Sequence, residues 1–462
     1  MRNTIILAVI AIALAAYVYF VEIKGGEQKA KEKEIAGKLF NFKKDSIDHI
    51  IIKKNGQTFE FVKKEDAWQI VQPIQTLADE SPINSVLYSL SNTKKIRTFN
   101  ASGKNLATYG LGDQSIKVQF SGKGVPEQWI KIGDRTPVGG NVFVSSDDST
   151  VVIVASSIKS AMDKSLFDWR DKKAIHFKKD QVKEFTLKNP HGKFHFVKDG
   201  NNWRLTKPIE TRGDNSNINA VLNKLEYGRI KAVAAETPKN LAKYGLSAPA
   251  YRIELFSGLE KARSGVSFSR LKGNKAYGKD DARPHIFEVD SFFVKPFKKK
   301  LYDFRDKYIA KFNRNEAQRI KLLYNSELMI FEKDSSNNWL LSTGEKAKNY
   351  KISNLISNLN NLKAQQFVDD HPRNLKKYGL EPPRGMVEVY NDKDEKILVL
   401  LVGRDKNDDY FYAQVPELKA VVTFKKADLE KIFPKKEDLI EKPKTEKSEE
   451  TEKSKGEEKA DQ

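Results

Sequence analysis

Hydrophobic and polar positions alternate along much of this chain. After residue 40, apolar residues recur in three short groups separated by the turn-rich segments Lys-Asn-Gly and Lys-Glu-Asp. The groups are Ile47, Ile50 and Ile52, then Phe59 and Phe61, then Trp68 and Ile70. Short apolar groups between turn residues predict three strands, the last of which ends at Pro73.

A helix and four further strands are predicted downstream. Ile83, Val86, Leu87 and Leu90 stand at the i, i+3, i+4, i+7 spacing of an amphipathic helix. Alternating segments follow around residues 116–120, 129–132, 142–144 and 151–154. A closing helix is predicted to place on one face Ile158, Ala161, Met162, Leu166 and Trp169.

The whole pattern then repeats. The triplets Tyr109-Gly110-Leu111, Tyr244-Gly245-Leu246 and Tyr378-Gly379-Leu380 are 135 and 134 residues apart, each a few residues after an Asn-Leu pair. Trp68, Trp203 and Trp339 follow the same period, and Asp168-Trp169-Arg170-Asp171-Lys172 returns as Asp303-Phe304-Arg305-Asp306-Lys307. A period this long indicates tandem small domains rather than a solenoid.

The predicted fold class is therefore α+β, with three tandem copies of a mainly antiparallel sheet-plus-helices module behind one N-terminal transmembrane helix. Short connections favour antiparallel pairing. The predicted organisation is a cytoplasmic tip (1–3), a transmembrane signal anchor (4–23), a linker (24–39), module 1 (40–172), module 2 (173–307), module 3 (308–434) and a disordered charged tail (435–462).

The anchor is predicted from 18 uncharged residues, Thr4 to Val21, which would span roughly 27 Å as a helix. Small residues at Ala11, Ala13 and Ala15 leave a cleaved signal peptide as an alternative. Lysines after the span argue for a cytoplasmic body, but long domains often cross regardless of charge. We expect a single-pass protein of the inner (cytoplasmic) membrane, with its body facing the periplasm or the cell exterior.

The repeated residues are predicted to be structural. Each glycine of a Tyr-Gly-Leu triplet is well placed as a left-handed cap, with the leucine folded back onto the preceding turn. The three tryptophans are expected in the core. The pairs Arg170-Asp171 and Arg305-Asp306 could resemble acid–base groups, but we interpret them as joints between modules.

The composition excludes much chemistry. The chain has 462 residues and no Cys, which removes disulfides, thiolate metal sites and cysteine nucleophiles. Of the six His, His191 and His195 are four apart, but Asn189-Pro190-His191-Gly192 predicts a hairpin turn rather than a helical metal site. No motif indicates a catalytic residue, metal ligand or cofactor-binding residue, so no cofactor is predicted.

The net charge of +20 comes from 82 Lys and Arg against 62 Asp and Glu. Dispersed lysines are typical of a solvated surface, but contact with an anionic lipid or polymer is also open. The densest basic-aromatic cluster contains Lys298, Lys299, Lys300 and Arg305. Nucleic acid is not favoured as a partner, because no recognition motif is present.

These residues resemble a family of membrane-anchored bacterial proteins with a repeated α+β domain of unknown function (DUF4340-like), associated with gliding-motility-type ABC transporters. The resemblance rests on the predicted anchor, the Trp-x-x-x-x-Pro step, the Asn-Leu-x-x-Tyr-Gly-Leu loop and the Arg-Asp-Lys exit. The third copy departs from it with Gly344 in place of the proline.

The resemblance implies a periplasmic accessory subunit of an exporter and supplies no catalytic residues. We therefore expect a non-catalytic interaction protein whose partner is an ABC transporter permease or another envelope protein. Two alternatives stay open: an envelope enzyme with carboxylates from different modules in one cleft, and a binder of anionic polymer or lipid headgroups.

Overall fold

The computed structural model describes residue 19, residues 33–101 and residues 105–442. The chain divides into two compact units, one with module 1 and residues 229–233, the other with the rest of module 2 and module 3. The predicted anchor (4–23) lies outside the described residues except for Tyr19. Within the described ranges, no helix is both long and apolar enough to cross a membrane.

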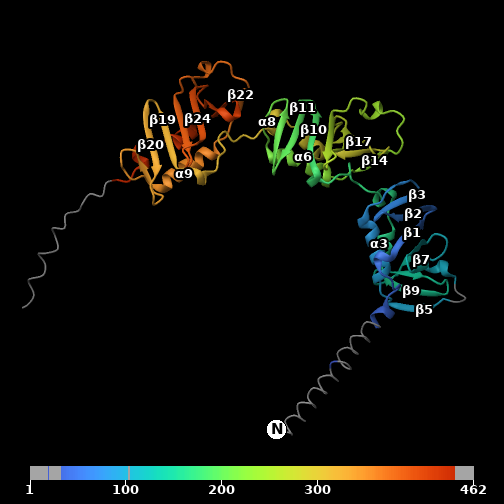
Figure 1. The fold of residues 1–462 in the computed structure, drawn as a ribbon. Helices are drawn as coiled ribbons and strands as arrows, with labels where there is room; N and C mark the ends of the chain where they lie inside the picture. Colours follow the sequence, from blue (N-terminus) through green and yellow to red (C-terminus); the bar gives the residue numbers. More distant parts are fainter. Residues whose placement is uncertain (1–18, 20–32, 102–104, 443–462) are drawn as a thin grey trace, which may run out of the picture. The chain divides into compact units, whose positions relative to one another are not determined.

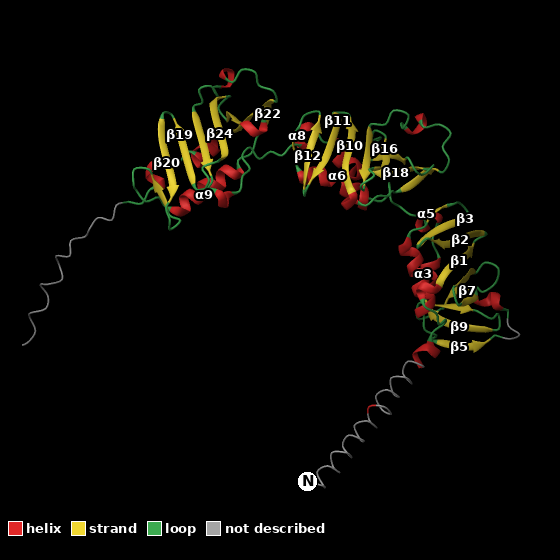
Figure 2. Ribbon diagram, viewed as in Figure 1, coloured by secondary structure: helices red, strands yellow, loops and turns green. Residues whose placement is uncertain are grey.

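Three antiparallel sheets with covering helices confirm three tandem α+β modules (Figures 1 and 2). In module 1 the strand order is β4-β3-β2-β1-β6-β7-β8-β9-β5. The strands are β1 (Ile47–Lys54), β2 (Gln57–Lys64), β3 (Ala67–Gln72), β4 (Thr76–Leu77), β5 (Arg97–Asn100), β6 (Ile116–Gly122), β7 (Val125–Arg135), β8 (Asn141–Ser145) and β9 (Thr150–Ala155). The seven predicted strands are present, and β4 and β5 are two short additions at opposite edges.

Module 2 repeats this order as β13-β12-β11-β10-β15-β16-β17-β18-β14. Its strands are β10 (Val182–Asn189), β11 (Gly192–Asp199), β12 (Asn202–Lys207), β13 (Thr211–Arg212), β14 (Ala232–Ala235), β15 (Tyr251–Ser257), β16 (Ala262–Phe268), β17 (Lys275–Asp280) and β18 (Ile286–Asp290). The predicted hairpin turn at Pro190-His191 joins β10 to β11.

Module 3 has eight strands in the order β21-β20-β19-β23-β24-β25-β26-β22. They are β19 (Arg319–Tyr324), β20 (Glu327–Lys333), β21 (Trp339–Leu341), β22 (Gln366–Asp369), β23 (Gly385–Tyr390), β24 (Lys396–Asp405), β25 (Tyr410–Val415) and β26 (Ala420–Lys425). Only an isolated bridge, Leu340 with Lys346, stands where the other modules have a short edge strand.

One 13-residue helix packs on one face of each sheet: α3 (Glu80–Asn92), α6 (Asn215–Tyr227) and α9 (Asn349–Asn361) (Figure 1). The predicted stripe Ile83, Val86, Leu87 and Leu90 is buried on α3 and joins alternate strand residues in the main core. The short helices are α4 (Ser157–Met162), α5 (Leu166–Trp169), α7 (Ser291–Val294), α8 (Leu301–Phe304), α10 (Leu429–Ile432) and α11 (Lys436–Leu439).

Two predicted boundaries need correction. The single closing helix of module 1 is two helices, because the chain leaves the helical conformation at Asp163 and Ser165 caps α5 with a capping box. Module 3 also continues past residue 434, since α11 is folded and Leu439 is 1% exposed in the module's core. The described chain runs on to Lys442, so residues 435–442 do not belong to a disordered tail.

Candidate functional site

The segment that leaves each module pairs with that module's own sheet edge. Residue Ala78 forms a bridge with Arg170, Gly213 with Arg305, and Ala347 with Ile440. The shared spacing identifies Asp438-Leu439-Ile440-Glu441-Lys442 as a third, divergent copy of the Asp-Trp-Arg-Asp-Lys segment. The third copy was missed from the sequence because its aromatic and arginine positions hold leucine and isoleucine.

Arg305 joins module 2 to module 3. Its side chain is 2% exposed, and its Nη1 donates to Asp370 Oδ1 at 2.6 Å, while its guanidinium carbon lies 3.4 Å from the ring centre of Phe367. Burial lowers the pKa of Arg305, opposed by the hydrogen bond and charge of Asp370. Asp306, the next residue in the sequence, instead faces Arg212 and Lys311 at 3.6 and 3.9 Å.

Backbone and side-chain hydrogen bonds reinforce this joint. Ile309 N donates to Leu362 O, and Ala364 N donates to Lys307 O, at 2.9 and 2.7 Å. Tyr302 on α8 donates to Ala364 O at 3.3 Å. The two bonds made by Ala364 tie the exit of module 2 to the segment that follows α9, and the Ile309 bond fixes the first residues of module 3 to the same segment, so the joint is a structured contact rather than a free linker.

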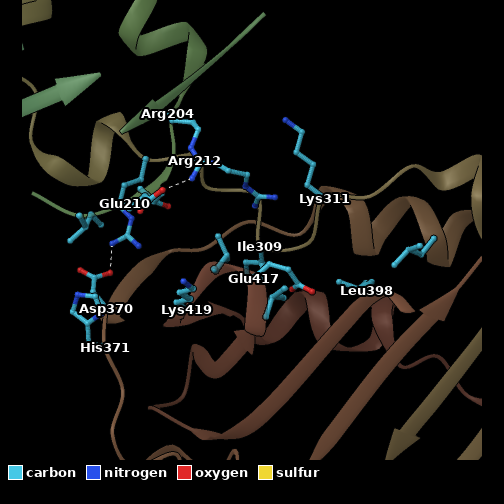
Figure 3. A pocket seen from close by; sticks show the side chains of 16 residues that line it. Arg204, Glu210, Arg212, Ile309, Lys311, Asp370, His371, Leu398, Glu417 and Lys419 are labelled. Atoms are coloured by element: carbon cyan, nitrogen blue, oxygen red, sulfur yellow. Dashed lines mark hydrogen bonds and ion pairs between the residues drawn. The ribbon is translucent and has the colours of Figure 1, made fainter. Parts of the chain in front are cut away.

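A cavity of about 420 Å³ lies beside the joint (Figure 3). It brings together carboxylates from two modules, namely Glu210, Asp370 and Glu417. Glu210 binds Arg204 at 2.7 Å and Asp370 binds Arg305. Two of the three carboxylates are thus held in ion pairs with arginines, and the cavity also contains Lys311 and Lys419.

The residues of the predicted basic cluster differ in exposure, since Lys298 and Lys300 are exposed, Lys299 is half-buried and Arg305 is buried. Lys299 Nζ binds the side chain of Asn217, and Lys300 N donates to Asp303 Oδ2 at 2.8 Å at the start of α8. Lys298 ends a short 3₁₀ turn and is exposed. Arg305 is buried in the joint, so it is not available to an anionic partner; Arg170, the equivalent residue of module 1, is also 2% exposed.

The repeated tryptophans lie in the module interiors, and each Tyr-Gly-Leu triplet forms a cap whose leucine is buried. Trp68, Trp203 and Trp339 are 5%, 3% and 3% exposed. Gly110, Gly245 and Gly379 have φ of 69°, 68° and 67°, the left-handed cap that the sequence predicts. The leucines Leu111, Leu246 and Leu380 are buried, and each tyrosine ring (Tyr109, Tyr244, Tyr378) packs on one aromatic ring of its sheet (Phe143, Tyr277, Tyr412).

In module 1 this loop covers part of the sheet face opposite α3, which we call the outer face. Leu106, Tyr109 and Leu111 pack with Phe99, Phe143 and Val151 from β5, β8 and β9 in a small second core. The rest of the outer face, over β1, β6 and β7, carries Lys53, Lys117, Trp129 and Lys131. Side chains alternate between the two faces of a strand, so these residues point away from α3.

The strand pairings identify the residues of modules 2 and 3 that are equivalent to Lys53, Lys117, Trp129 and Lys131. Module 2 has Lys188, Arg252, Gly265 and Ser267 there, and module 3 has Leu323, Met386, Val399 and Leu401. In module 2, Arg252 binds Asp281 at 2.5 Å, and Glu254 binds both Arg252 and Arg263. Burial would raise the pKa of Glu254, but Arg263 and Arg252 together lower it. At these four positions the outer faces are thus basic-aromatic in module 1, polar in module 2 and aliphatic in module 3, where the aliphatic residues lie beside an ion pair of Glu388 and Lys396.

Module 3 also has a groove where the other modules are filled. Leu439 takes the place of Trp169 and Phe304, and Met329 that of Phe194. Phe304 packs on Phe194 with ring centres 5.2 Å apart. The smaller side chains border a cavity of about 830 Å³ between α9, α11 and β20. No motif indicated this groove, because it arises from lost volume rather than from an added group.

The histidines and carboxylates form no metal site in the part of the chain that the structure describes, since no three such groups are suitably placed. His191 lies in the β10–β11 turn, and His195 lies on β11 with Nδ1 2.7 Å from Thr206 Oγ1. The two side chains therefore belong to a turn and a strand, not to one helix face.

Comparisons with known proteins place the chain in a family. No curated protein matches it. Solved structures include two from Pseudomonas aeruginosa, a DNA polymerase sliding clamp with ligand (10% identity, 85% of this chain and 95% of that chain) and a DNA polymerase III subunit beta (7%, 82% and 92%). Both have TM-scores of 0.14, too low to indicate a shared fold. A family model, Domain of unknown function (DUF4340), matches residues 68–249, 203–348 and 339–447. The chain therefore belongs to the DUF4340 family.

Proposed function

We propose that this chain is a non-catalytic, membrane-anchored interaction protein that acts outside the cytoplasm, as an auxiliary subunit of an ABC-type exporter or a gliding-type envelope complex. One observation carries the proposal: a single scaffold is used three times with three chemically different outer faces. Core positions keep their apolar character between modules, whereas the four compared outer positions change from basic-aromatic to polar to aliphatic. Surfaces that diverge on a retained core are typical of binding to different partners.

The joint supports the same proposal. The Arg305–Asp370 pair and the backbone bond from Ala364 to Lys307 connect modules 2 and 3. The resemblance to exporter-associated proteins supports an ABC transporter as the class of partner.

Affinity purification of the full chain from detergent-solubilised membranes tests the partner. We expect an ABC transporter permease to be recovered reproducibly. Repeated recovery of the chain without any transporter subunit would refute the exporter version of the proposal.

The native chain has no Cys, so one introduced cysteine reports topology without background. Leu259→Cys places it at a residue that is 93% exposed, and Leu205→Cys at a fully buried one serves as the control. A membrane-impermeant maleimide should label the first variant, and not the second, in intact spheroplasts. Labelling of Leu259→Cys only after the membrane is opened would place the body in the cytoplasm and contradict the proposal.

A further inference from the structure

Three lysines stand in one row on the outer face of module 1. Lys53 lies directly opposite Lys117, and Lys117 lies directly opposite Lys131, on the adjacent strands β1, β6 and β7. Neighbouring strands are about 4.8 Å apart, so the three side chains emerge close together. Like charges placed directly opposite one another destabilise a sheet. The row therefore destabilises the folded sheet, so a contribution to stability does not explain why three lysines occupy these positions.

Little within the protein neutralises this row. Lys131 Nζ binds Asp148 at 2.6 Å, but that carboxylate is 51% exposed at a loop. Across the described ranges of the chain, neither Lys53 nor Lys117 forms an ion pair. Two carboxylates of the same face, Glu60 and Glu127, are hydrogen-bonded to His49 at 2.9 Å and to Gln119 at 3.0 Å and not to Lys53 or Lys117. Two adjacent ammonium groups thus remain available to an external anion.

An aromatic ring lies beside the row. Trp129 is next to Lys131 on the same face of β7, and the ammonium groups of Lys117 and Lys131 are each 5.6 Å from its ring centre. The other four tryptophans of the chain are at most 5% exposed, whereas Trp129 is only half-buried. The equivalent residues Gly265 and Val399 show that the fold does not need a large ring at this position.

We infer that the outer face of module 1 binds an acidic polysaccharide. Lys53 and Lys117 would bind successive carboxylates of the polymer, and the ring of Trp129 would pack against a sugar ring. The strand spacing is comparable to the length of one sugar residue, so a chain lying across β1, β6 and β7 matches the row. The loop of residues 105–112 covers the neighbouring strands on the same face, which favours a linear ligand over a flat lipid surface.

The inference deepens the proposed function and rests on it for one point, because an extracytoplasmic location favours polysaccharide over nucleic acid. The binding experiment needs neither a transporter nor a membrane. A failed transporter purification would therefore leave this inference intact, and a failure of polysaccharide binding would leave the exporter proposal intact.

Binding of the purified full chain in detergent to polygalacturonate, with neutral dextran as the control polymer, tests the inference between 50 and 200 mM salt. We expect binding to polygalacturonate alone, weakening with salt. Lys53→Gln and Lys117→Gln should each reduce the slope of log affinity against log salt by about one. Trp129→Val, which introduces the residue of module 3, should weaken binding at every salt concentration and leave the slope unchanged.

The matched control is Lys123→Gln, which removes an exposed lysine from the turn between β6 and β7 and should change nothing. Unchanged thermal unfolding of each variant shows that the fold is retained. Equal affinities of the Lys117→Gln and Lys123→Gln variants would overturn the inference. Tighter, Lys117-dependent binding to single-stranded DNA or to phosphatidylglycerol vesicles would also overturn it, in favour of those ligands.

Discussion

The joint between modules 2 and 3 leads to an asymmetric prediction. Arg305 is 2% exposed, whereas its partner Asp370 is 31% exposed. Asp370→Asn leaves a buried cation without a counter-charge, and removal of one partner of a buried pair costs about 3–5 kcal/mol. Arg305→Met leaves a carboxylate that water can reach and keeps an apolar contact with Phe367. Since an accessible ion is hydrated, we expect that loss to be only about 1 kcal/mol.

Hydrogen exchange at the amide of Ala364 measures this difference, because its hydrogen bond to Lys307 O crosses the joint. At about 1.4 kcal/mol per tenfold, Asp370→Asn should speed exchange at this amide by at least about a hundredfold, and Arg305→Met by less than about tenfold. The double variant should exchange more slowly than Asp370→Asn alone, because no unpaired buried charge remains.

Lys311→Gln is the matched control. Its ammonium is 54% exposed and 3.9 Å from Asp306, so exchange at the joint should not change. An Arg305→Met variant that opens the joint as much as Asp370→Asn would refute the reasoning, because the cost would then not come from an unpaired buried charge.

Four further predictions concern the modules themselves. Gly110→Ala should cost more unfolding free energy than Gly245→Ala, by about 1 kcal/mol or more in denaturant titrations, because both glycines are left-handed but a Cβ at Gly110 would overlap Asp134. Lys348→Asp should stabilise module 3 by less than about 1 kcal/mol, since α9 lacks the aspartate N-cap of α3 and α6 but the substitution also removes two long, exposed hydrogen bonds from Lys348 Nζ to Glu437 O and Asp438 O; no gain in thermal stability would contradict this. Burial lowers the pKa of His195, so stability should fall as pH drops below about 6.5, and His195→Gln should remove that slope. Hydrogen bonds from Thr343 and Lys436 lower the pKa of Glu345 to about 2, so its contribution should be lost only as pH falls from about 4.5 towards 2, and an acid titration of Glu345→Gln should lack that step.

Local patterns predicted the elements that bury apolar residues with a regular period. The stripe on α3 and the alternation in β1 and β6 are examples, since burial imposes those periods directly. The short strands β4 and β5 carry no such pattern, because they are held at the sheet edges by two to four residue pairs. The break at Asp163 depends on a capping box that an unbroken apolar stripe conceals.

The contacts at the joint could not be predicted from the sequence of a single module, because they involve residues of two modules. Arg305 was expected to act at a joint, but its partner lies 65 residues away, beyond any local pattern. The repeat itself holds a usable signal: Asp370 corresponds to Glu236 in module 2 and to Ala101 in module 1. An acidic residue therefore stands at this position only in modules that follow another module. The outer faces could not be predicted in the same way, because their positions vary between copies.

The segments that leave the modules (168–172, 303–307 and 438–442) indicate how a further module could be added to the chain. Arginine stands at this position in modules 1 and 2, each followed by another module, whereas module 3 has Ile440. Every module closes its own sheet edge with its own exit residues, so its core is complete without a neighbour. Addition of a module then needs only a duplicated module and one substitution at the exit of the module before it. A duplication of residues 308–442 that also carries Ile440→Arg in the first copy would give a four-module protein with a new buried pair at the added joint.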